Sequence, residues 1–422
     1  MEQYQPLTTF TGPFTFHKTS NMGIYEKLGL TPIVNATGAV TRLGGSRLRQ
    51  SAIDAYQQAS NQSVPLEQLQ AAASRQIAEF TGSEAGLVTS GAAAALTLGA
   101  AAILAKLDSG RMEQLPHTEN MPNSFLVARE HRSGYDHAVR ASGARLVEVG
   151  FNEQVAGAGV RRVETWEYEI AISPQTAGIL YVYHPQSYPP LPQIIEMAIR
   201  HNLPILVDAA GELPPRSNLR DLGASGVDLV AFSGGKAIGG PQPTGILCGR
   251  KDLVASAALQ MLDMDDHPDL WSPPESFIDR SRMFGMPRHG IGRGMKVSKE
   301  AICSLLAALQ EFVSEDPSSK NVLFYQWLEQ IQDSLSDVHV KSEIVQSTVP
   351  EVPPRLELTL KSQGSQDAFR ICQQLRLGTP PVYVGHNKLE EGTLVINPTV
   401  LNEDQIAPLT DALIKVLSDS ES

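Results

Sequence analysis

The sequence has few cysteines and no long apolar run. Three cysteines occur in 422 residues, Cys248, Cys303 and Cys372, and their spacing matches neither a metal site nor a disulfide framework. We therefore expect free thiols, a reducing cytoplasmic location and no bound metal. No apolar run is long enough to cross a bilayer, and residues 1–21 lack a basic region followed by an apolar core. Neither membrane insertion nor export is expected.

Positive charge is also scarce. Lys and Arg number 34 against 46 Asp and Glu, which gives a formal net charge of −12. Nucleic-acid-binding proteins usually display a clustered basic face, so this balance favours a small-molecule substrate over a nucleic-acid partner. With 42% hydrophobic residues, the chain can bury a sizeable core. Its length predicts about two to three structural units.

Strand and helix patterns alternate through the middle of the chain. A short strand, a small-residue turn and an apolar helix follow one another over 81–107, after a helical pattern over 65–79. Further strands are predicted within 124–130, 145–150, 176–185, 203–211 and 227–235, and helices within 132–143 and 191–202. Several strands are apolar on both faces, which indicates an α/β fold with a mainly parallel sheet.

The pattern changes after a Pro- and Met-rich stretch at 261–287. A helix with an apolar stripe is expected over 296–313, and shorter segments from 354 to 419 suggest a smaller α+β unit. We predict four parts, which are an N-terminal arm (1–24), a segment that packs with the small domain or a partner subunit (25–60), a large domain (61–287) and a small C-terminal domain (288–422).

One lysine stands out in "AFSGGKAIGG", where Lys236 follows an apolar strand and lies between two glycine pairs. A nucleotide-binding loop of the Walker type would need a glycine six residues earlier and a serine or threonine directly after the lysine. Val230 and Ala237 occupy those positions, so the sequence departs from the Walker motif at two positions and does not predict a nucleotide-binding loop. A surface lysine in a turn and a reactive amine at a strand end remain open.

Neighbouring motifs favour the reactive amine. Asp208 ends a buried-looking strand, and the turn "TSGAA" opens a helix, so both meet the lysine at the carboxyl edge of the sheet. Pyridoxal 5′-phosphate (PLP) needs these parts, because an amine forms a Schiff base with its aldehyde, a carboxylate keeps its pyridine nitrogen protonated, and a helix start holds its phosphate. The phosphate contacts predicted are Ser90, Gly91, Ala92 and Ser233.

Two more strand ends offer side chains for the cofactor ring. His131 is the candidate for stacking on the ring, with Tyr135 as the alternative in "AREHRSGYDHA". The strand at 176–185 is followed by His184, Gln186 and Ser187, any of which could reach the cofactor's phenolic oxygen. The sequence does not choose among these three residues.

The chain resembles the fold-type I PLP enzymes of the selenocysteine synthase (seryl-tRNA selenium transferase) branch, most of all the subgroup containing D-glucosaminate-6-phosphate ammonia-lyase. The resemblance covers about Tyr25 to Leu401. Its motifs are "PIVNATGAVTRLGGS", "TSGAAAAL", "REHRSGYDHAVRASGA", "ILVDAAGELPP", "DLVAFSGGKAIGGPQPTGILCGRKDLV" and "GIGRGMKVSKEAICSLLAAL". The resemblance implies a large PLP domain with a seven-stranded-type sheet, a smaller C-terminal domain, and a homodimer or higher homo-oligomer.

By these motifs, Lys236 would be the Schiff-base lysine, Asp208 the partner of the pyridine nitrogen and His131 the stacking residue. Ser90, Gly91, Ala92 and Ser233 would hold the phosphate. Arg42, Arg288 and Arg293 lie beside glycines in family-like motifs and are candidates for binding a substrate carboxylate or phosphate.

Two departures from the family bear on function. Only 34 residues precede Asn35 of the "NATG" motif, whereas the selenium transferase carries a tRNA-binding region there, so tRNA binding is not expected. The segment "GTLVINPTVL" also lacks the arginine that many aminotransferases use. We predict a PLP-dependent lyase that eliminates water or ammonia from a small hydroxylated amino acid or amino-sugar acid. Selenium transfer, racemisation, transamination and a non-catalytic regulatory role are the alternatives.

Overall fold

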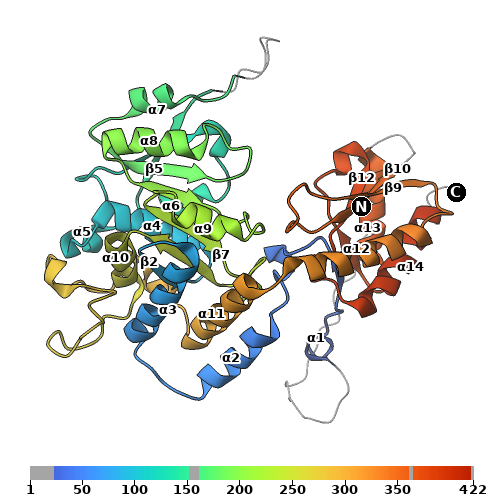
Figure 1. The fold of residues 1–422 in the computed structure, drawn as a ribbon, viewed down its shortest axis with the longest axis horizontal. Helices are drawn as coiled ribbons and strands as arrows, with labels where there is room; N and C mark the ends of the chain where they lie inside the picture. The colour runs from blue at the N-terminus through green and yellow to red at the C-terminus, as the bar shows by residue number, and fades with distance from the viewer. Residues whose placement is uncertain (1–22, 152–160, 361–364, 420–422) are drawn as a thin grey trace. The chain divides into compact units, whose positions relative to one another are not determined.

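The computed structural model of the protein describes residues 23–151, 161–360 and 365–419. Two compact units are present (Figure 1). The larger unit is Ala39–Pro317, and the smaller unit takes its described residues from Met1–Gly38 and Ser318–Ser422. The predicted arm at 1–24 lies almost wholly outside the described residues.

The larger unit alternates helices and strands, as predicted. Its strands are β2 (Ala85–Thr89), β3 (Ser124–Ala128), β4 (Arg145–Val149), β5 (Thr176–Val182), β6 (Ile205–Asp208), β7 (Leu229–Ser233) and β8 (Gly245–Gly249). Its helices are α2 (Gln50–Ser60), α3 (Leu66–Thr81), α4 (Ala92–Ala105), α5 (Ser109–Gln114), α6 (Asp136–Arg140), α7 (Thr165–Ala171), α8 (Leu191–His201), α9 (Ser217–Gly223), α10 (Lys251–Met261) and α11 (Lys299–Ser314). Short 3-10 turns are η1 (Thr41–Leu43), η2 (Arg129–His131), η3 (Arg280–Arg282) and η4 (Ile291–Met295).

The seven strands form one sheet in the order β2-β8-β7-β6-β5-β3-β4. All neighbours pair in parallel except β8, which runs antiparallel between β2 and β7. The prediction of a mainly parallel α/β sheet is therefore confirmed. Since β8 runs the other way, its first residue, Gly245, lies beside the last residues of β2 and β7, where it pairs with Thr89 and Ser233.

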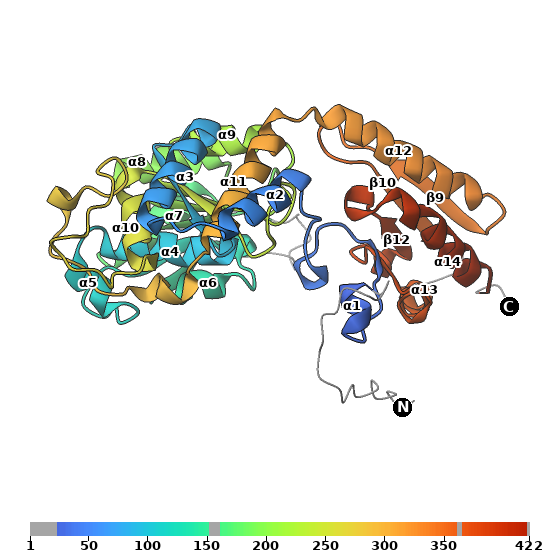
Figure 2. The same cartoon turned by 90° about the horizontal axis from the view of Figure 1, so that it is seen from below.

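The core of the larger unit lies between this sheet and its helices, which enclose it in Figures 1 and 2. Helix α4 is apolar almost all round, as expected for a helix buried in the core. A Cβ atom placed on its Gly99 would lie 2.8 Å from Cδ1 of Leu206 on β6. Glycine at this position therefore lets the helix approach the strands closely.

The smaller unit has its own core. Its strands are β9 (Val340–Val345), β10 (Arg355–Leu360) and β12 (Thr393–Ile396), which form an antiparallel sheet in the order β12-β10-β9, and a parallel pair of β1 (Val34–Ala36) with β11 (Val382–Val384). Its helices are α1 (Ile24–Lys27), α12 (Pro317–Ser334), α13 (Ser365–Leu377) and α14 (Ile406–Asp419), with 3-10 turns η5 (Leu389–Glu391), η6 (Pro398–Val400) and η7 (Glu403–Gln405). This is the α+β unit that the sequence predicts.

The boundaries of the two units differ from the predicted ones. Residues 288–317, predicted to open the small domain, belong to the larger unit, as do residues 39–60. The physical reason is that α11 packs on α2. The buried hydroxyl of Ser304 donates a hydrogen bond of 2.8 Å to the carbonyl of Ala52, and Arg49 forms ion pairs with Glu311 and Glu315.

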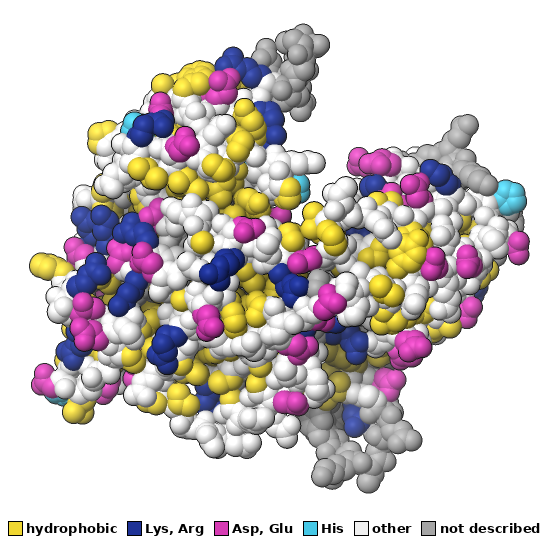
Figure 3. All heavy atoms as spheres, in the orientation of Figure 1, with side chains coloured by type: hydrophobic (Ala, Val, Ile, Leu, Met, Phe, Trp, Pro, Cys, Tyr) yellow, Lys and Arg dark blue, Asp and Glu magenta, His cyan; other side chains and the backbone are white. Residues whose placement is uncertain are grey.

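The surface of the larger unit carries mixed charge. On the face drawn in Figure 3, Lys and Arg side chains lie among Asp and Glu side chains. Several arginines of this unit form ion pairs near the surface, as Arg250 does with Asp228 and Asp252 at 2.7 Å each. Such pairs balance the local charge but add little stability. Among the described residues, no helix is both long enough and apolar enough to cross a membrane.

Candidate active site

The predicted site residues come from strand ends at one edge of the sheet. β2, β3, β5, β6 and β7 run in the same direction, so their carboxyl ends share this edge. Directly after these strands come Ser90, His131, His184, Asp208 (itself the last residue of β6) and Lys236. The topology therefore gathers them at the edge where ligands of such sheets bind.

Lys236 lies in a tight turn between β7 and β8. Gly234 N donates to Thr244 O at 2.9 Å, and Gly239 N donates to Lys236 O at 2.9 Å, so the turn closes on itself. A Cβ atom on Gly235 would lie 2.5 Å from Cα of Gln242, so this glycine is needed for close approach. The glycines next to Lys236 thus shape the turn that carries its amine.

A second segment, which the sequence analysis did not identify, binds this turn. Ser46 N donates to Gly235 O at 3.0 Å, and its hydroxyl donates to Lys236 O at 2.5 Å. Arg49 Nε donates to Ile238 O at 2.7 Å. Segment 46–49 therefore fixes the lysine turn from outside the sheet. Its only sequence signal was its place at the end of the "PIVNATGAVTRLGGS" motif.

Asp208 is held close to Lys236. Its Oδ1 accepts a hydrogen bond of 3.0 Å from Ala210 N, and its carbonyl accepts one of 2.9 Å from Tyr183 N. Burial raises the pKa of the Asp208 carboxyl, while the Ala210 N–H and the charge of Lys236 oppose this rise. A partly buried carboxylate with one cationic neighbour suits a partner such as a protonated pyridine nitrogen.

The predicted phosphate loop and Ser233 meet at Gly245. A Cβ atom on Gly245 would lie 2.4 Å from the carbonyl carbon of Gly91, and Gly245 pairs with Ser233 across the β7–β8 ladder. Gly91 (φ 102°) begins α4 without a side-chain cap, and a Cβ on Gly91 would have no atom within 4 Å. The first N–H groups of α4, starting at Ala92, are therefore available to an anion.

His131 is buried, yet its imidazole has no hydrogen-bond partner among the described residues. Both ring nitrogens are unpaired, and the ring packs edge-on against Tyr181 with centroids 4.8 Å apart. Burial lowers the pKa of His131 to about 4, with the charge of Glu130 opposing this and that of Arg162 adding to it. The ring is therefore neutral near neutral pH. A buried, unpaired polar ring points to a missing partner in the site.

The segment after β5 places its three candidates differently. Ser187 donates its hydroxyl to Val182 O at 2.8 Å, which uses its donor within the loop. Gln186 is exposed, and its backbone N–H donates to His184 Nδ1 at 3.2 Å. The charge of His184 acts on Glu212, a carboxylate that the sequence analysis missed. Of the three, His184 is thus the residue whose charge acts on the same carboxyl group, that of Glu212, as the charges of Asp208 and Lys236 do.

The three candidate arginines lie in separate places. Arg42 is exposed on η1, and the exposed Arg288 lies 3.6 Å from Glu113. Arg293 forms an ion pair with Asp263, and both line a cavity of about 430 Å³. The other lining residues are Leu66, Gln70, Met261, Leu262, Lys296, Val297, Ser298 and Ile302. No strand-end residue of the site lines this cavity. The role of these arginines in substrate binding stays a prediction.

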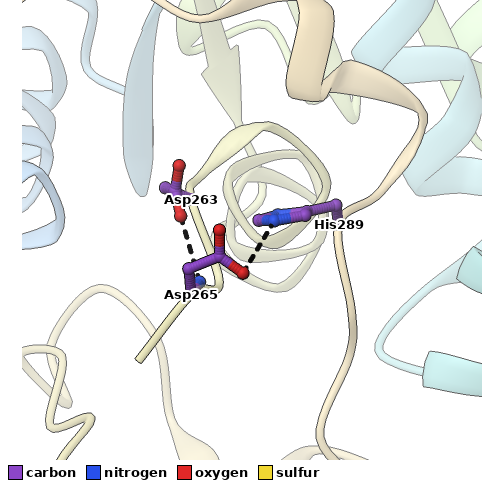
Figure 4. Close-up of side chains that lie close together, drawn as sticks. All are labelled: Asp263, Asp265 and His289. Atoms are coloured by element: carbon purple, nitrogen blue, oxygen red, sulfur yellow. Dashed lines mark hydrogen bonds and ion pairs between the residues drawn. The ribbon is translucent and has the colours of Figure 1, made fainter. Parts of the chain in front are cut away.

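One group of side chains has the composition of a metal site. Asp263, Asp265 and His289 lie close together on the surface (Figure 4). Asp265 N donates to Asp263 Oδ1 at 3.0 Å, and His289 Nε2 lies 3.1 Å from Asp265 Oδ1. Arg293 forms an ion pair with Asp263 as well. Exposed groups that already have these partners give no reason to infer a bound ion, so the expectation of no metal stays a prediction.

The donor set fits PLP. It combines an amine beside a partly buried carboxylate, an uncapped helix start and a buried imidazole without a partner among the described residues. The fold agrees with this set. A serine palmitoyltransferase from S. paucimobilis, solved with bound PLP–myriocin, covers 93% of this chain and 89% of its own with a TM-score of 0.52 at 11% identity. The protein thus has the fold of the fold-type I PLP enzymes.

The chain belongs to the family described as SelA, L-seryl-tRNA selenium transferase, whose match spans residues 33–264. This family and the shared fold point to PLP as its cofactor, as predicted. A 5'-C-glycyluridine monooxygenase-decarboxylase from Streptomyces sp is 29% identical over 94% of this chain and 92% of its own. A D-glucosaminate-6-phosphate ammonia lyase from Salmonella typhimurium is 26% identical, and the match covers 93% of this chain and 97% of the lyase.

A solved D-glucosaminate-6-phosphate ammonia-lyase aligns with this chain at a TM-score of 0.77 and 25% identity, covering 96% of this chain and all of its own. The predicted resemblance is therefore confirmed. The monooxygenase-decarboxylase belongs to a class of relative that was not predicted from the sequence.

Proposed function

We propose that this protein is a PLP-dependent lyase that carries out α,β-elimination on a small hydroxylated amino acid or amino-sugar acid. The observation that carries the proposal is the grouping of Lys236 and Asp208 beside the uncapped start of α4. The match to an ammonia lyase over 93% of the chain supports elimination over the other reactions.

Each residue has a distinct task in this proposal. Lys236 would hold the cofactor through its amine and, once released by substrate, would accept the Cα proton as general base. Asp208 would keep a proton on the ring nitrogen, and His131 would contact the ring as a neutral imidazole. Ser90, Gly91, Ala92 and Ser233 would bind the phosphate. When bound, PLP supplies an electron sink for the pair left at Cα.

The substrate needs an anion-binding group, and Arg42, Arg288 and Arg293 are the proposed ones.

We also propose a homodimer or larger homo-oligomer. Support comes from large apolar side chains exposed on and beside α2, namely Leu48, Ile53, Tyr56 and Val64, since exposed apolar clusters mark interaction surfaces. A cytoplasmic location stays a prediction from the cysteine content.

Oxidative decarboxylation of an amino acid is the second candidate function. It is favoured by the 29% identity to the monooxygenase-decarboxylase over 94% of the chain. Both candidates use the same lysine, carboxylate and phosphate loop, and they differ in the bond broken and in the need for oxygen. Selenium transfer, racemisation and transamination share the platform as well. A regulatory role without catalysis would leave the unpaired imidazole of His131 unexplained.

The test begins with PLP binding. Purified protein reconstituted with PLP should show the absorbance of a lysine-bound cofactor, and Lys236→Ala should abolish that absorbance. The loaded protein is then screened against D- and L-amino acids and sugar-derived amino acids. Ammonia release without an amino acceptor or oxygen supports elimination, whereas oxygen uptake with carbon dioxide release supports the second candidate. A wild-type protein that cannot bind PLP would falsify both.

A further inference from the structure

A further cavity of the larger unit lies at the opposite edge of the sheet from Lys236. Its volume is about 400 Å³, within the range of roughly 300–1,000 Å³ that small-molecule sites occupy. Ile205, which opens β6, and Asp228, which directly precedes β7, both line it. The other ends of these two strands carry Asp208 and lead to Lys236. The cavity is therefore separate from the candidate active site.

Two helix ends meet at this cavity, and each has an unusual backbone. Lys106 follows α4 and Asn202 follows α8, and both residues line the cavity. Among the described residues, these are the two that have a positive φ without being glycine, at 53° each. Lys106 combines this φ with a ψ of −134°, a conformation that glycine adopts at much lower cost. Backbone strain of this kind clusters at ligand-binding and catalytic sites, so the side chain at this position has a reason to be kept.

The side chains at these two helix ends leave hydrogen-bond donors for a ligand. The amine of Lys106 and the side-chain amide of Asn202 are exposed and have no hydrogen bond or ion pair within the described part of the chain. The carboxylate beside them is occupied, because Oδ2 of Asp228 accepts from Ile205 N at 2.8 Å and its Oδ1 accepts from Arg250 at 2.7 Å. A ligand that binds here therefore has to bring acceptors.

The charges that line the cavity favour an anion. The positive charge of Arg250 is balanced, because this residue forms ion pairs of 2.7 Å with both Asp228 and Asp252. Lys106 forms no such pair with a described residue, so its charge is left for a ligand. An amine that donates to a carboxylate or phosphate group forms one of the stronger kinds of hydrogen bond. The polar side of the cavity thus suits an anionic group.

The rest of the cavity wall is largely apolar. Ile103, Ala198 and Leu253 line it and are buried, whereas Ile199 lines it with 72% of its surface exposed. An apolar group placed against Ile199 would remove this side chain from water, which is favourable. The cavity therefore offers an apolar surface beside a free amine and a free amide.

We propose that this cavity binds a small organic anion, whose carboxylate or phosphate group contacts Lys106 and Asn202 and whose apolar body packs on Ile199. The site does not depend on the proposed function, because none of its lining residues is among those assigned to the cofactor or the substrate. Its ligand is a second small molecule, bound at the amino ends of strands whose carboxyl ends lead to the candidate active site.

The first test measures binding of phenyl phosphate to the full chain by NMR titration. The protein is loaded with PLP beforehand, so that the cofactor occupies the phosphate loop. Wild type should bind the probe at one saturable site, and Lys106→Gly should weaken this binding at least tenfold because a charge-assisted hydrogen bond is lost. Glycine suits the backbone at this position, so the variant should still fold. No saturable binding by wild type, or equal affinities in the two proteins, overturns the proposal.

The matched control is Arg200→Met. Arg200 is an exposed cation near the end of α8, pairs with Glu169 and does not line the cavity, so its loss should leave the affinity unchanged. A loss as large as that of Lys106→Gly would show that the probe responds to surface charge in general. Inorganic phosphate and benzyl alcohol, which each carry one half of the probe, should bind at least tenfold more weakly than phenyl phosphate. Equal affinity for either one shows that the cavity does not select an organic anion.

The second test locates the site in the cofactor-free protein. An amine-acylating reagent is added with and without phenyl phosphate, and modification of Lys106 is measured by peptide mass spectrometry. Bound probe should slow the reaction at Lys106, while Lys341, whose side chain is 69% exposed in the smaller unit, should react at an unchanged rate. Unchanged acylation of Lys106 contradicts the proposal. Protection of Lys106 in a protein that cannot bind PLP would end the proposed function and leave this site standing.

Discussion

The hydroxyl of Ser46 donates a hydrogen bond of 2.5 Å to the backbone carbonyl of Lys236, across 190 residues of sequence. The same carbonyl also accepts the N–H of Gly239, which closes the lysine turn. The position of the amine thus depends on a segment that precedes the first strand of the sheet. A reactive side chain needs such support because small displacements cost catalytic efficiency.

Ser46→Ala should weaken PLP binding without unfolding the protein. Among the described residues, the variant leaves Lys236 O with only the bond from Gly239, so the turn is held less firmly before the cofactor arrives. One lost hydrogen bond of about 1 kcal/mol corresponds to about fivefold lower affinity, measurable by absorbance titration with PLP. Ser60→Ala is the control, because within the described part of the chain its exposed hydroxyl donates only to Gln57 O, in its own helix. Equal affinities in wild type and Ser46→Ala would show that the bond does not position the turn.

Arg49→Met should destabilise the larger unit. Arg49, with a side chain 10% exposed, bonds Ile238 O at 2.7 Å and pairs with Glu311 and Glu315 at 2.9 and 2.7 Å. Loss of the guanidinium leaves two carboxylates without this cation, at a cost of about 2 kcal/mol in the free energy of unfolding. Urea unfolding measures it. Arg161→Met is the comparison, since its pair with Glu164 is exposed and should contribute little. If Arg49→Met and Arg161→Met lose similar amounts of unfolding free energy, the contacts of Arg49 do not stabilise the larger unit as predicted.

Gly245→Ala should disturb the phosphate loop. A Cβ atom at this position would lie 2.4 Å from the carbonyl carbon of Gly91 and 2.6 Å from Ala92 N, so the loop must move. We expect at least tenfold weaker PLP binding and a loss of about 1–3 kcal/mol in stability. Gly294→Ala is the control, because a Cβ there meets no atom within 4 Å. Normal PLP affinity in Gly245→Ala would show that this loop does not bind the cofactor.

Asp208→Asn should stabilise the cofactor-free protein while it weakens PLP function. Burial raises the pKa of Asp208, so the folded protein holds this proton more tightly than the unfolded chain does. The charged carboxylate therefore costs folding free energy at pH values above its raised pKa, and this cost is absent in acid, below the unfolded value. The melting temperature at neutral pH should rise by about 2–4 °C. A lower melting temperature at neutral pH would contradict this reasoning.

Much of the fold could be predicted because most strands of the larger unit before the lysine are apolar and bounded by turn residues. β2, β3, β5, β6 and β7 all lie within predicted segments. The gathering of Asp208 and Lys236 also followed from sequence, because parallel strands place their carboxyl ends at one edge. Strand β8 was not identified, since it is short, begins and ends with glycine and follows a turn without a helix.

The parts that could not be predicted depend on contacts between distant residues. Ser46 and Arg49 carry no motif that marks them as partners of the lysine turn, and their bonds span 189 and 190 residues. The boundary near 317 depends on how α11 packs against α2, which helical periodicity does not reveal.

His131→Phe should make the protein less sensitive to acid. Burial lowers the pKa of His131 from 6.5 to about 4, so the unfolded chain takes up a proton at a pH where the folded protein does not. The stability tied to this neutral ring is complete above about pH 6.5 and is lost as the pH falls toward 4. Between about pH 7 and pH 5, wild type should lose about 2 kcal/mol more than His131→Phe in urea unfolding.

The control for this prediction is His137→Asn, because His137 is exposed on α6 and belongs to the same region of the larger unit. That variant should lose stability on acidification as wild type does. Phenylalanine keeps a flat ring against Tyr181, so His131→Phe should still fold and bind PLP, though without the two nitrogens that lack partners among the described residues. If acid destabilises His131→Phe as much as wild type, another group causes the loss and the buried imidazole does not titrate in this range.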